Sequence, residues 1–251
     1  MKISIITATY NSGATLRDTF DSILRQGYDD YEVLIQDGGS TDDTMEIVRE
    51  YAPRFGAKMK AVSEKDNGLY DAMNRAIRRA TGDVVGILNS DDFYTADDVL
   101  ENVVSHFTDD IDAVYGDVHF VNPEDLHNMV RYYSSRIFRP WMLRFGYMPA
   151  HPSFYVRREV YERYGTYSLD YKLAADYDMM VRLFYKHKIH AKYLKQDFVT
   201  MRIGGISTKN LHNRLQISKE DVIACKRNGM YTNFLFICVK YFAKIFEFRW
   251  W

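Results

Sequence analysis

The sequence predicts an α/β fold in which helices cover a mainly parallel, Rossmann-like sheet, and two patterns predict it. Short apolar runs without polar alternation, of which residues 3–7 are the first, are typical of strands buried on both faces. A turn and then a segment with apolar residues at helical spacing follow the first of these runs. With 251 residues the chain is also long enough to bury a sizeable core.

The first part of the chain contains two successive units of strand, turn and helix. Residues 3–7 form the first predicted strand, and one face of the helix that follows carries Leu16, Phe20, Ile23 and Leu24. Residues 31–36 form the second strand, and its helix face carries Ile47, Val48 and Tyr51. Between them, Ser40 with Asp43 three residues later predicts a capping box.

The alternation continues to about residue 113 and then weakens. A third helix ends at Gly82, a strand follows over residues 84–88, and a further helix face carries Val99, Leu100, Val103, Val104 and Phe107. Residues 113–122 are strand material, whereas residues 123–150 are aromatic and irregular. A helix returns at Asp176, with Met180, Leu183 and Phe184 on its apolar face.

Composition and charge restrict the class of function. The chain is 47% hydrophobic and 27% charged with 5 Pro, so we expect it to be folded throughout. Residues 1–208 carry a net charge of -6, which disfavours nucleic acid as a partner and suits a site for a divalent cation. Residues 209–251 have eight lysines or arginines against three acidic residues, a net charge of +5.

The expected location is the cytoplasm, with peripheral contact to the inner face of the membrane as an option. Two cysteines exclude a disulfide scaffold, and their spacing is not that of a zinc site. The first residues show no signal-peptide pattern, and no window approaches the roughly 20 apolar residues of a membrane span.

Four acidic or aromatic positions admit a functional and a structural interpretation. Ligands of parallel sheets gather at the carboxyl ends of strands, where Asp37 and the pair Asp91-Asp92 stand. The pair can bridge a diphosphate and a Mg2+ or Mn2+ ion, or it can cap the next helix. Asp37 either points at a ligand or serves its turn. Tyr10 either stacks on a base or packs, and Asp176 is either a general base or an N-cap.

The order of several motifs is more specific than any one of them. Residues 4–11 read SIITATYN, residues 33–42 VLIQDGGSTD, residues 66–68 DNG, residues 72–74 AMN, residues 88–92 LNSDD and residues 175–178 ADYD. Over about residues 1–205 this succession resembles glycosyltransferase family 2, the inverting enzymes of the GT-A fold. Residues 149–154, PAHPSF, and 174–183 are similar to bacterial members that build surface polysaccharides.

The resemblance implies a role for each matching position. Tyr10 would stack on the donor base, Asp37 would accept from the base ring nitrogen, and Asp66 would border base and ribose, with Ala8 and Gly68 in the same donor-binding motifs. Asp91 would contact the ribose or the metal, and Asp92 would be the principal ligand of a Mg2+ or Mn2+ ion. Asp176 would be the catalytic base. Two positions depart from the family, since Ala175 stands where glutamate is common and Asn89 where aspartate is frequent.

The implied reaction is transfer from a nucleoside diphosphate sugar, expected to be a UDP-sugar, to a hydroxyl of a saccharide or lipid-linked acceptor. His151 is the acceptor-side candidate, although a structural histidine is as good an interpretation. Residues 204–208 are either a loop that closes on the donor or an ordinary turn. Two alternatives are a nucleotidyltransferase, disfavoured because no glycine-rich phosphate motif follows the first strand, and a non-catalytic sugar-nucleotide-binding or scaffold protein.

The resemblance also suggests a division of the chain. Residues 1–208 would form the catalytic domain, with 1–117 as the donor half and 118–208 as the acceptor half, and residues 209–251 a basic, aromatic helical tail. That tail suits an interfacial helix, with Lys240 and Lys244 near anionic lipid, or it packs on the domain or on a second subunit. If it binds a membrane, a chain ending near Asn210 should stay folded.

Overall fold

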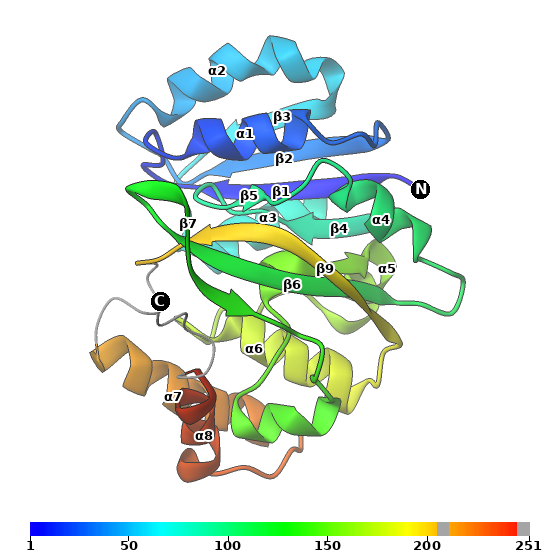
Figure 1. Cartoon of the computed structure of the whole chain (residues 1–251), viewed down its shortest axis with the longest axis vertical. Helices are drawn as coiled ribbons and strands as arrows, with labels where there is room; N and C mark the ends of the chain where they lie inside the picture. Colours follow the sequence, from blue (N-terminus) through cyan, green and yellow to red (C-terminus); the bar gives the residue numbers. More distant parts are fainter. Residues whose placement is uncertain (205–210, 245–251) are drawn as a thin grey trace.

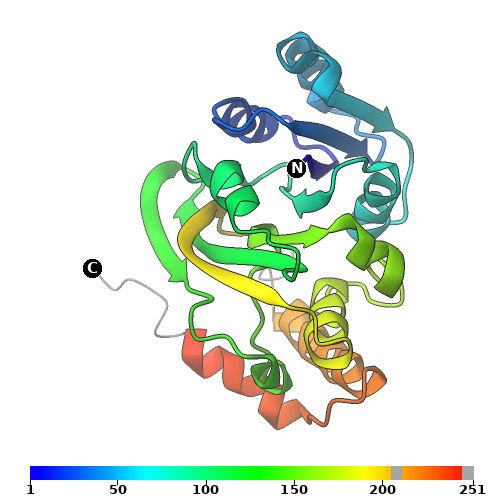
Figure 2. The ribbon, with the colours of Figure 1, turned by 90° about the vertical axis from the view of Figure 1, so that its right-hand side faces the viewer.

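In the computed structural model, which describes residues 1–204 and 211–244, nine strands form one curved sheet between two layers of helices (Figure 1). The strand order is β3-β2-β1-β4-β8-β6-β9-β5, and β7 pairs with the later part of β6, beyond the residues that pair with β8. One hydrophobic cluster lies beneath α1, α2 and α4, and a second beneath α3, α5, α6 and α7. Figure 2 shows these two layers on opposite sides of the sheet.

The first four strands are parallel, and the apolar runs predict three of them, β1, β2 and β4. They are β1 (Ile3–Thr9), β2 (Tyr31–Asp37), β3 (Met59–Ser63) and β4 (Val84–Ile87). The predicted helices are confirmed as α1 (Leu16–Leu24), α2 (Thr44–Phe55) and α3 (Leu69–Arg79). Strand β3 lies at the edge of the sheet with three of its five residues exposed, so it lacks the apolar run that marks its neighbours.

The second half makes the sheet mixed rather than mainly parallel. Its strands are β5 (Phe93–Tyr94), β6 (Ala113–Asn122), β7 (Asp125–Tyr133), β8 (Phe154–Arg157) and β9 (Ala191–Arg202). Strand β8 enters antiparallel between β4 and β6, and β5 pairs antiparallel with β9, whereas β6 and β9 are parallel. The prediction of parallel pairing therefore holds for β1 to β4 and for β6 with β9, whereas β5, β7 and β8 pair antiparallel.

The segment without periodicity contains a long strand and short helical turns. Strand β7 was not predicted, because most of its residues are only partly buried and alternate poorly. It is followed by the short helices η2 (Pro140–Phe145) and η3 (His151–Ser153). Helices α4 (Val99–Ser105) and α5 (Arg158–Tyr164) flank this half. The predicted helix at Asp176 is α6 (Ala175–Met180), which continues as a π-helical turn, η4 (Val181–Lys186).

The tail contains two helices that pack on the domain. They are α7 (Leu211–Arg227) and α8 (Phe234–Lys244), and they bury Ala224, Cys225 and Ile237 in the same cluster as α6. Lys240, expected at a lipid surface, is instead buried in an ion pair with Asp221, 2.5 Å away. A buried ammonium group needs such a partner, so this lysine belongs to the core. No helix among residues 1–204 and 211–244 is long and apolar enough to cross a membrane.

Candidate active site at the carboxyl ends of the strands

The turns after β1 and β2 are bound to each other and form one wall of the candidate site. Asn11 has the left-handed backbone (φ 51°) that asparagine tolerates. Its amide donates to Oγ of Ser40 at 2.7 Å, and its side-chain oxygen accepts from the amide of Thr41 at 2.9 Å. Tyr10, beside it, is 64% exposed, so its ring is available for stacking, whereas Ala8 is buried and can offer only backbone atoms.

Asp37 is buried and its carboxylate serves the turn. One oxygen accepts from the backbone amides of Gly39 and Ser40, at 3.1 and 3.0 Å, and from the hydroxyl of Ser63, while the other accepts from the hydroxyl of Ser40. In this conformation Asp37 therefore serves its turn, which is the structural one of its two interpretations. The capping box is wrong, because Ser40 is engaged with Asp37 and Asn11, and α2 begins only after Asp43.

Asp66 and Gly68 lie on the loop before α3, against the turn after β2. Gly68 has φ 109°, which a residue with a side chain rarely adopts, and its amide donates to Asp66 at 2.8 Å. A Cβ at Gly38 would lie 2.8 Å from a carboxylate oxygen of Asp66, so the missing side chain there lets the two loops approach. The predicted donor-binding residues thus come together on three adjacent loops.

Asp91 and Asp92 lie in the turn after β4. Helix α4 begins only at Val99, so the pair does not cap it. Asp91 is exposed, whereas Asp92 is only 2% exposed. Burial, and then the charge of Asp91, raises the pKa of Asp92 well above its ordinary value.

The oxygens at this turn fit a hard cation. One carboxylate oxygen of Asp92 and the side-chain oxygen of Asn89 are buried without a hydrogen-bond partner. A buried carboxylate without a partner is costly, and a divalent ion would supply the missing positive charge. Among the described residues, no group of three or more His, Cys, Asp or Glu is placed to hold a metal. An ion at Asp92 would therefore need further ligands from a diphosphate and water.

Asp176 lies within a chain of contacts that leads back to Asp92. The side-chain nitrogen of Asn89 lies 3.4 Å from Nε2 of His151, and Nδ1 of His151 lies 3.6 Å from Oδ2 of Asp176. The backbone oxygen of Asn89 accepts from the amide of Asp92 at 3.1 Å, and the Asn89 side chain also acts on the Asp92 carboxylate. The N-cap of α6 is Ala174, so the N-cap interpretation of Asp176 is wrong. The structure thus brings together the metal, acceptor-side and base candidates.

Two further residues at the site were not predicted. The hydroxyl of Tyr70 donates to Oδ1 of Asp176 at 3.0 Å. Arg202, the last residue of β9, donates to the backbone oxygen of Asp91 and pairs with Asp18. Both contacts join positions more than 100 residues apart, and the sequence contains no local pattern that would pair them. Gly204 is a turn residue with φ 99°, and the rest of the predicted closing loop lies outside the described residues.

His151 is expected to be neutral at pH 7. Burial lowers its pKa below the ordinary 6.5, and the nearby Asp176 and Asp91 only partly offset this. The unfolded chain therefore binds a proton here as the pH falls through about 6.5, whereas the folded chain resists it. The resulting contribution to stability is present above that pH and is lost as the pH falls toward the folded pKa.

The variant His151→Gln tests this by urea unfolding at pH 7 and pH 5. Glutamine does not titrate, so the variant should lose less stability between the two pH values than the wild type, by about 1 kcal/mol or less. His187, whose pKa burial also lowers, titrates in both proteins and cancels in the comparison. Equal losses in the two proteins would contradict the prediction.

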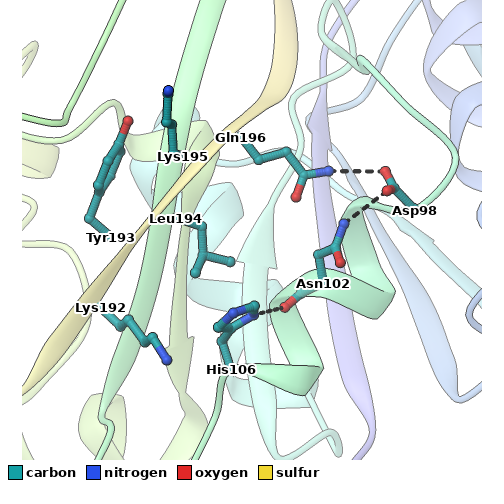
Figure 3. Close-up of a pocket in the computed structure, with 8 residues that line it drawn as sticks. All are labelled: Asp98, Asn102, His106, Lys192, Tyr193, Leu194, Lys195 and Gln196. Atoms are coloured by element: carbon teal, nitrogen blue, oxygen red, sulfur yellow. Dashed lines mark hydrogen bonds between the residues drawn. The ribbon is translucent and has the colours of Figure 1, made fainter.

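Two hollows on the surface lie away from these residues. Figure 3 shows an open one of about 540 Å³ between α4 and β9, where Asp98 accepts hydrogen bonds from Asn102 and Gln196. A second, of about 730 Å³, is lined by residues of η4 together with Pro140, Lys188, Ile189 and Asn228. Neither contains a predicted site residue, so the candidate site rests on the convergence of its side chains at the sheet edge.

Comparison with known proteins gives consistent findings. Residues 4–165 match the family model Glycosyl transferase family 2. A PGL/p-HBAD biosynthesis glycosyltransferase of Mycobacterium bovis is 33% identical over 193 residues, which are 76% of this chain and 73% of the relative. The crystal structure of S. aureus TarS 1–349 in complex with UDP-GlcNAc is similar in fold, with a TM-score of 0.69, 17% identity, and coverage of 92% of this chain and 68% of that one. A Pyrobaculum calidifontis mannosyltransferase in complex with GDP-Man and Mn2+ has a TM-score of 0.68, 22% identity, and coverage of 95% and 68%.

Proposed function

This chain belongs to glycosyltransferase family 2, and we propose that it transfers the sugar of a nucleoside diphosphate donor to a hydroxyl of a saccharide or lipid-linked acceptor, with inversion. The observation that carries the proposal is the chain of contacts from Asp92 through Asn89 and His151 to Asp176. It connects a carboxylate suited to a cation on the leaving group with a carboxylate suited to deprotonate the acceptor. Transfer in one displacement requires that both carboxylates act on the same bound sugar, one at its leaving group and the other at the attacking hydroxyl.

The donor would lie across residues 1–117. Tyr10 is the exposed ring that would stack on the base, and Asp66 and Gly68 border the same loops. Asp37 would act mainly by holding its turn in shape, since its carboxylate oxygens already accept bonds from that turn and from Ser63. The donor complexes of the two structural neighbours, with UDP-GlcNAc and with GDP-Man, support the nucleotide-sugar class.

Asp92, with Asp91 next to it, would hold a divalent cation. When bound, the ion supplies positive charge that neutralises the departing diphosphate. The Mn2+ in the Pyrobaculum neighbour and the two unpartnered oxygens of Asp92 and Asn89 support this assignment. Arg202 brings a second positive charge beside Asp91 from the end of β9.

Asp176 would act as the general base. The acceptor oxygen attacks the anomeric carbon on the face opposite the diphosphate, whose oxygen leaves with the bonding electrons, and the acceptor proton passes to Asp176. One displacement of this kind inverts the anomeric centre, so no covalent sugar-enzyme intermediate forms. His151, whose pKa burial lowers, lies beside the second oxygen of Asp176.

A screen of nucleotide sugars tests the proposed function. UDP- and GDP-sugars are added with Mg2+, with Mn2+ or with EDTA, and both the thermal midpoint and the release of nucleoside diphosphate are measured. The proposal expects stabilisation and metal-dependent release for at least one donor, with an inverted linkage by NMR when an acceptor is present. Stabilisation without release would favour a non-catalytic sugar-nucleotide-binding protein. Release of pyrophosphate from an added nucleoside triphosphate would favour a nucleotidyltransferase.

We further propose that residues 118–208 bind the acceptor. His151 and Asp176 both come from this segment and approach the donor half at Asn89 and Tyr70. Residues 211–244 would support this half rather than form a separate module, because Ala224 and Cys225 are buried beside α6. A chain ending near Asn210 would expose that cluster, so we no longer expect it to fold.

Peripheral contact with an anionic membrane, where a lipid-linked acceptor would lie, remains part of the proposal. Its support is a row of aromatic contacts from Trp141 through Phe145 and Phe236 to Tyr231, which joins η2 to α8. Around this row the side chains of Trp141, Tyr231 and Leu235 are 56%, 69% and 78% exposed. Exposed Arg136 and Arg139 precede the row, in place of buried Lys240. Aromatic residues with adjacent basic groups suit the headgroup region.

The variant Leu235→Glu tests this contact without truncation. We expect binding of the full chain to phosphatidylglycerol vesicles to fall about tenfold or more. The variant loses a leucine that the membrane would bury and gains a negative charge that the anionic lipid repels. Leu69→Glu, at the start of α3 and far from α8 in Figures 1 and 2, makes the same change at a 41% exposed position and should bind as the wild type does. If the wild type ignores anionic vesicles, the membrane proposal is wrong.

A further inference from the structure

Helix α3 lies between the loop of the proposed donor site and the segment that carries the proposed base. One row of its side chains contacts the loop, and a second row contacts the segment. One face carries Asp71 and Arg75 at i, i+4, which form an ion pair at 2.9 Å. Asp71 also accepts from the amide and the side chain of Asn67, both at 3.1 Å, and Arg75 reaches Glu64 at 2.9 Å. These contacts fasten the start of the helix to the loop that carries Asp66 and Gly68.

The other face carries Tyr70 and Asn74, again at i, i+4, and holds the segment that leads to Asp176. The side chain of Asn74 donates to the backbone oxygen of Tyr167 at 2.8 Å and accepts from its amide at 2.9 Å. Asn74 is 3% exposed, so this pair of hydrogen bonds to the backbone is shielded from water. The ring of Tyr70 stacks on that of Tyr167 at 5.6 Å. Burial, and then the charge of Asp176, raises the pKa of Tyr70 well above its ordinary value, so its hydroxyl stays a donor.

The two oxygens of Asp176 are in different environments. Oδ1 accepts from the hydroxyl of Tyr70 at 3.0 Å and from the amide of Tyr177 at 2.9 Å. Oδ2 lies 3.6 Å from Nδ1 of His151, which is beyond hydrogen-bond distance. Oδ2 is therefore the oxygen that can receive a proton, and the two donors on Oδ1 orient it.

We propose that Tyr70 is a positioning residue for the base, holding Oδ1 of Asp176 so that Oδ2 faces the acceptor, and that α3 thereby fixes the base relative to the donor loop. This rests on the proposed function, in which Asp176 takes the acceptor proton. The coupling has a physical reason, because general base catalysis needs the oxygen within about 3 Å of the hydroxyl while the donor holds the anomeric carbon. A single helix that contacts both loops sets that distance.

The variant Tyr70→Phe keeps the ring and removes the hydroxyl. We expect kcat to fall about 10- to 100-fold, the range for losing one hydrogen bond to a charged group, while the Kd for the nucleoside diphosphate found in the screen stays within about twofold. The acid limb of the kcat profile should move to higher pH, because the hydroxyl no longer favours the charged form of the base. If Tyr70 had a purely structural role, its replacement would change neither the pH of this acid limb nor the ratio of kcat to the Kd for the nucleoside diphosphate.

Tyr161→Phe is the matched control. Tyr161 is 4% exposed, its ring lies 6.5 Å from that of Tyr167, and its hydroxyl contacts the Tyr167 side chain rather than Asp176. This variant should lower the thermal midpoint as much as Tyr70→Phe does and leave kcat and the pH profile unchanged. If both variants behave alike in kcat and pH profile, the inference is overturned while the proposed function stands. If the wild type turns over no donor, the proposed function fails and the positioning role with it.

A double-mutant cycle tests the contact itself by urea unfolding. Tyr70→Phe should lower the urea midpoint more in the wild-type background than in the Asp176→Ala background, where the hydroxyl has lost the carboxylate and keeps only its contacts with the backbone of residues 175 and 176. Equal shifts in the two backgrounds would show that the hydroxyl does not act on Asp176, and would overturn the proposal whatever the activity.

Discussion

Turnover of the Asp176→Asn variant is expected to fall by about 10²- to 10⁴-fold, the usual contribution of a general base. Asparagine has the size of aspartate but cannot take the acceptor proton. Its side-chain oxygen can still accept from Tyr70 and from the amide of Tyr177, so the local structure should persist. Donor binding should be retained because Asp176 is not among the residues proposed to bind the donor. The measurement is kcat under donor saturation together with the Kd of the nucleoside diphosphate.

Asp178→Asn supplies the control on the same helix. Asp178 is 5% exposed, accepts from Asn228 at 2.9 Å and lies 3.6 Å from Arg182. The same chemical change there should lower stability by about 1–3 kcal/mol and leave kcat nearly unchanged, since it weakens a buried charged pair. Loss of donor affinity in Asp176→Asn as large as its loss of kcat would point to a structural role for Asp176.

The Asp92→Asn variant is expected to lose metal-dependent turnover, by about 10²-fold or more, because a cation on the diphosphate contributes several kcal/mol to the transition state. Asparagine retains one oxygen but no charge, so the ion would be held weakly. The comparison is kcat against Mn2+ and Mg2+ concentration. If the variant keeps near-normal activity at low metal concentration, Asp92 is not the metal ligand.

The stability of the Asp92→Asn variant should change in the opposite direction to its activity. The pKa of Asp92 is raised in the fold, so its contribution to stability falls as the pH rises above the ordinary aspartate value, where the unfolded chain has already released the proton. Asparagine removes that cost, and the variant should be at least as stable as the wild type at pH 7 without metal. Asp97→Asn, an exposed acid of the same turn region that pairs with Arg25 at 3.3 Å, should change neither activity nor stability appreciably.

The parts of the fold that were predicted from sequence share one property, which is burial on both faces. Strand β1 is buried at every residue and appears in the sequence as an uninterrupted apolar run. Strands β3, β7 and β9 were missed because they are partly exposed, so apolar residues neither run nor alternate in them. The antiparallel entry of β8 was also missed, since a four-residue strand has no signal for its direction.

The candidate site was predicted residue by residue, but its connections were not. The sequence placed Asp37, Asp91 and Asp92 just past strands, and in the structure Asp37 is the last residue of β2 while Asp91 and Asp92 follow β4. The sequence could not distinguish Asp37, whose oxygens accept bonds from its own turn, from Asp92, which has an unpartnered oxygen. That difference depends on neighbours such as Ser63, 26 residues away.

What the sequence determined by itself was local: the first strands, the turns that end in aspartate, and the family to which their order belongs. Periodicity and turn chemistry act between residues a few positions apart, so they can be seen without coordinates. Only the tertiary structure decided that Asp176 meets Tyr70 and His151, and that Lys240 is buried against Asp221. An apolar helix face has the same pattern whether it covers a core or a membrane, and a hydrogen bond across 106 residues leaves no spacing to detect. Such contacts exist only when the sheet has closed and its layers have packed.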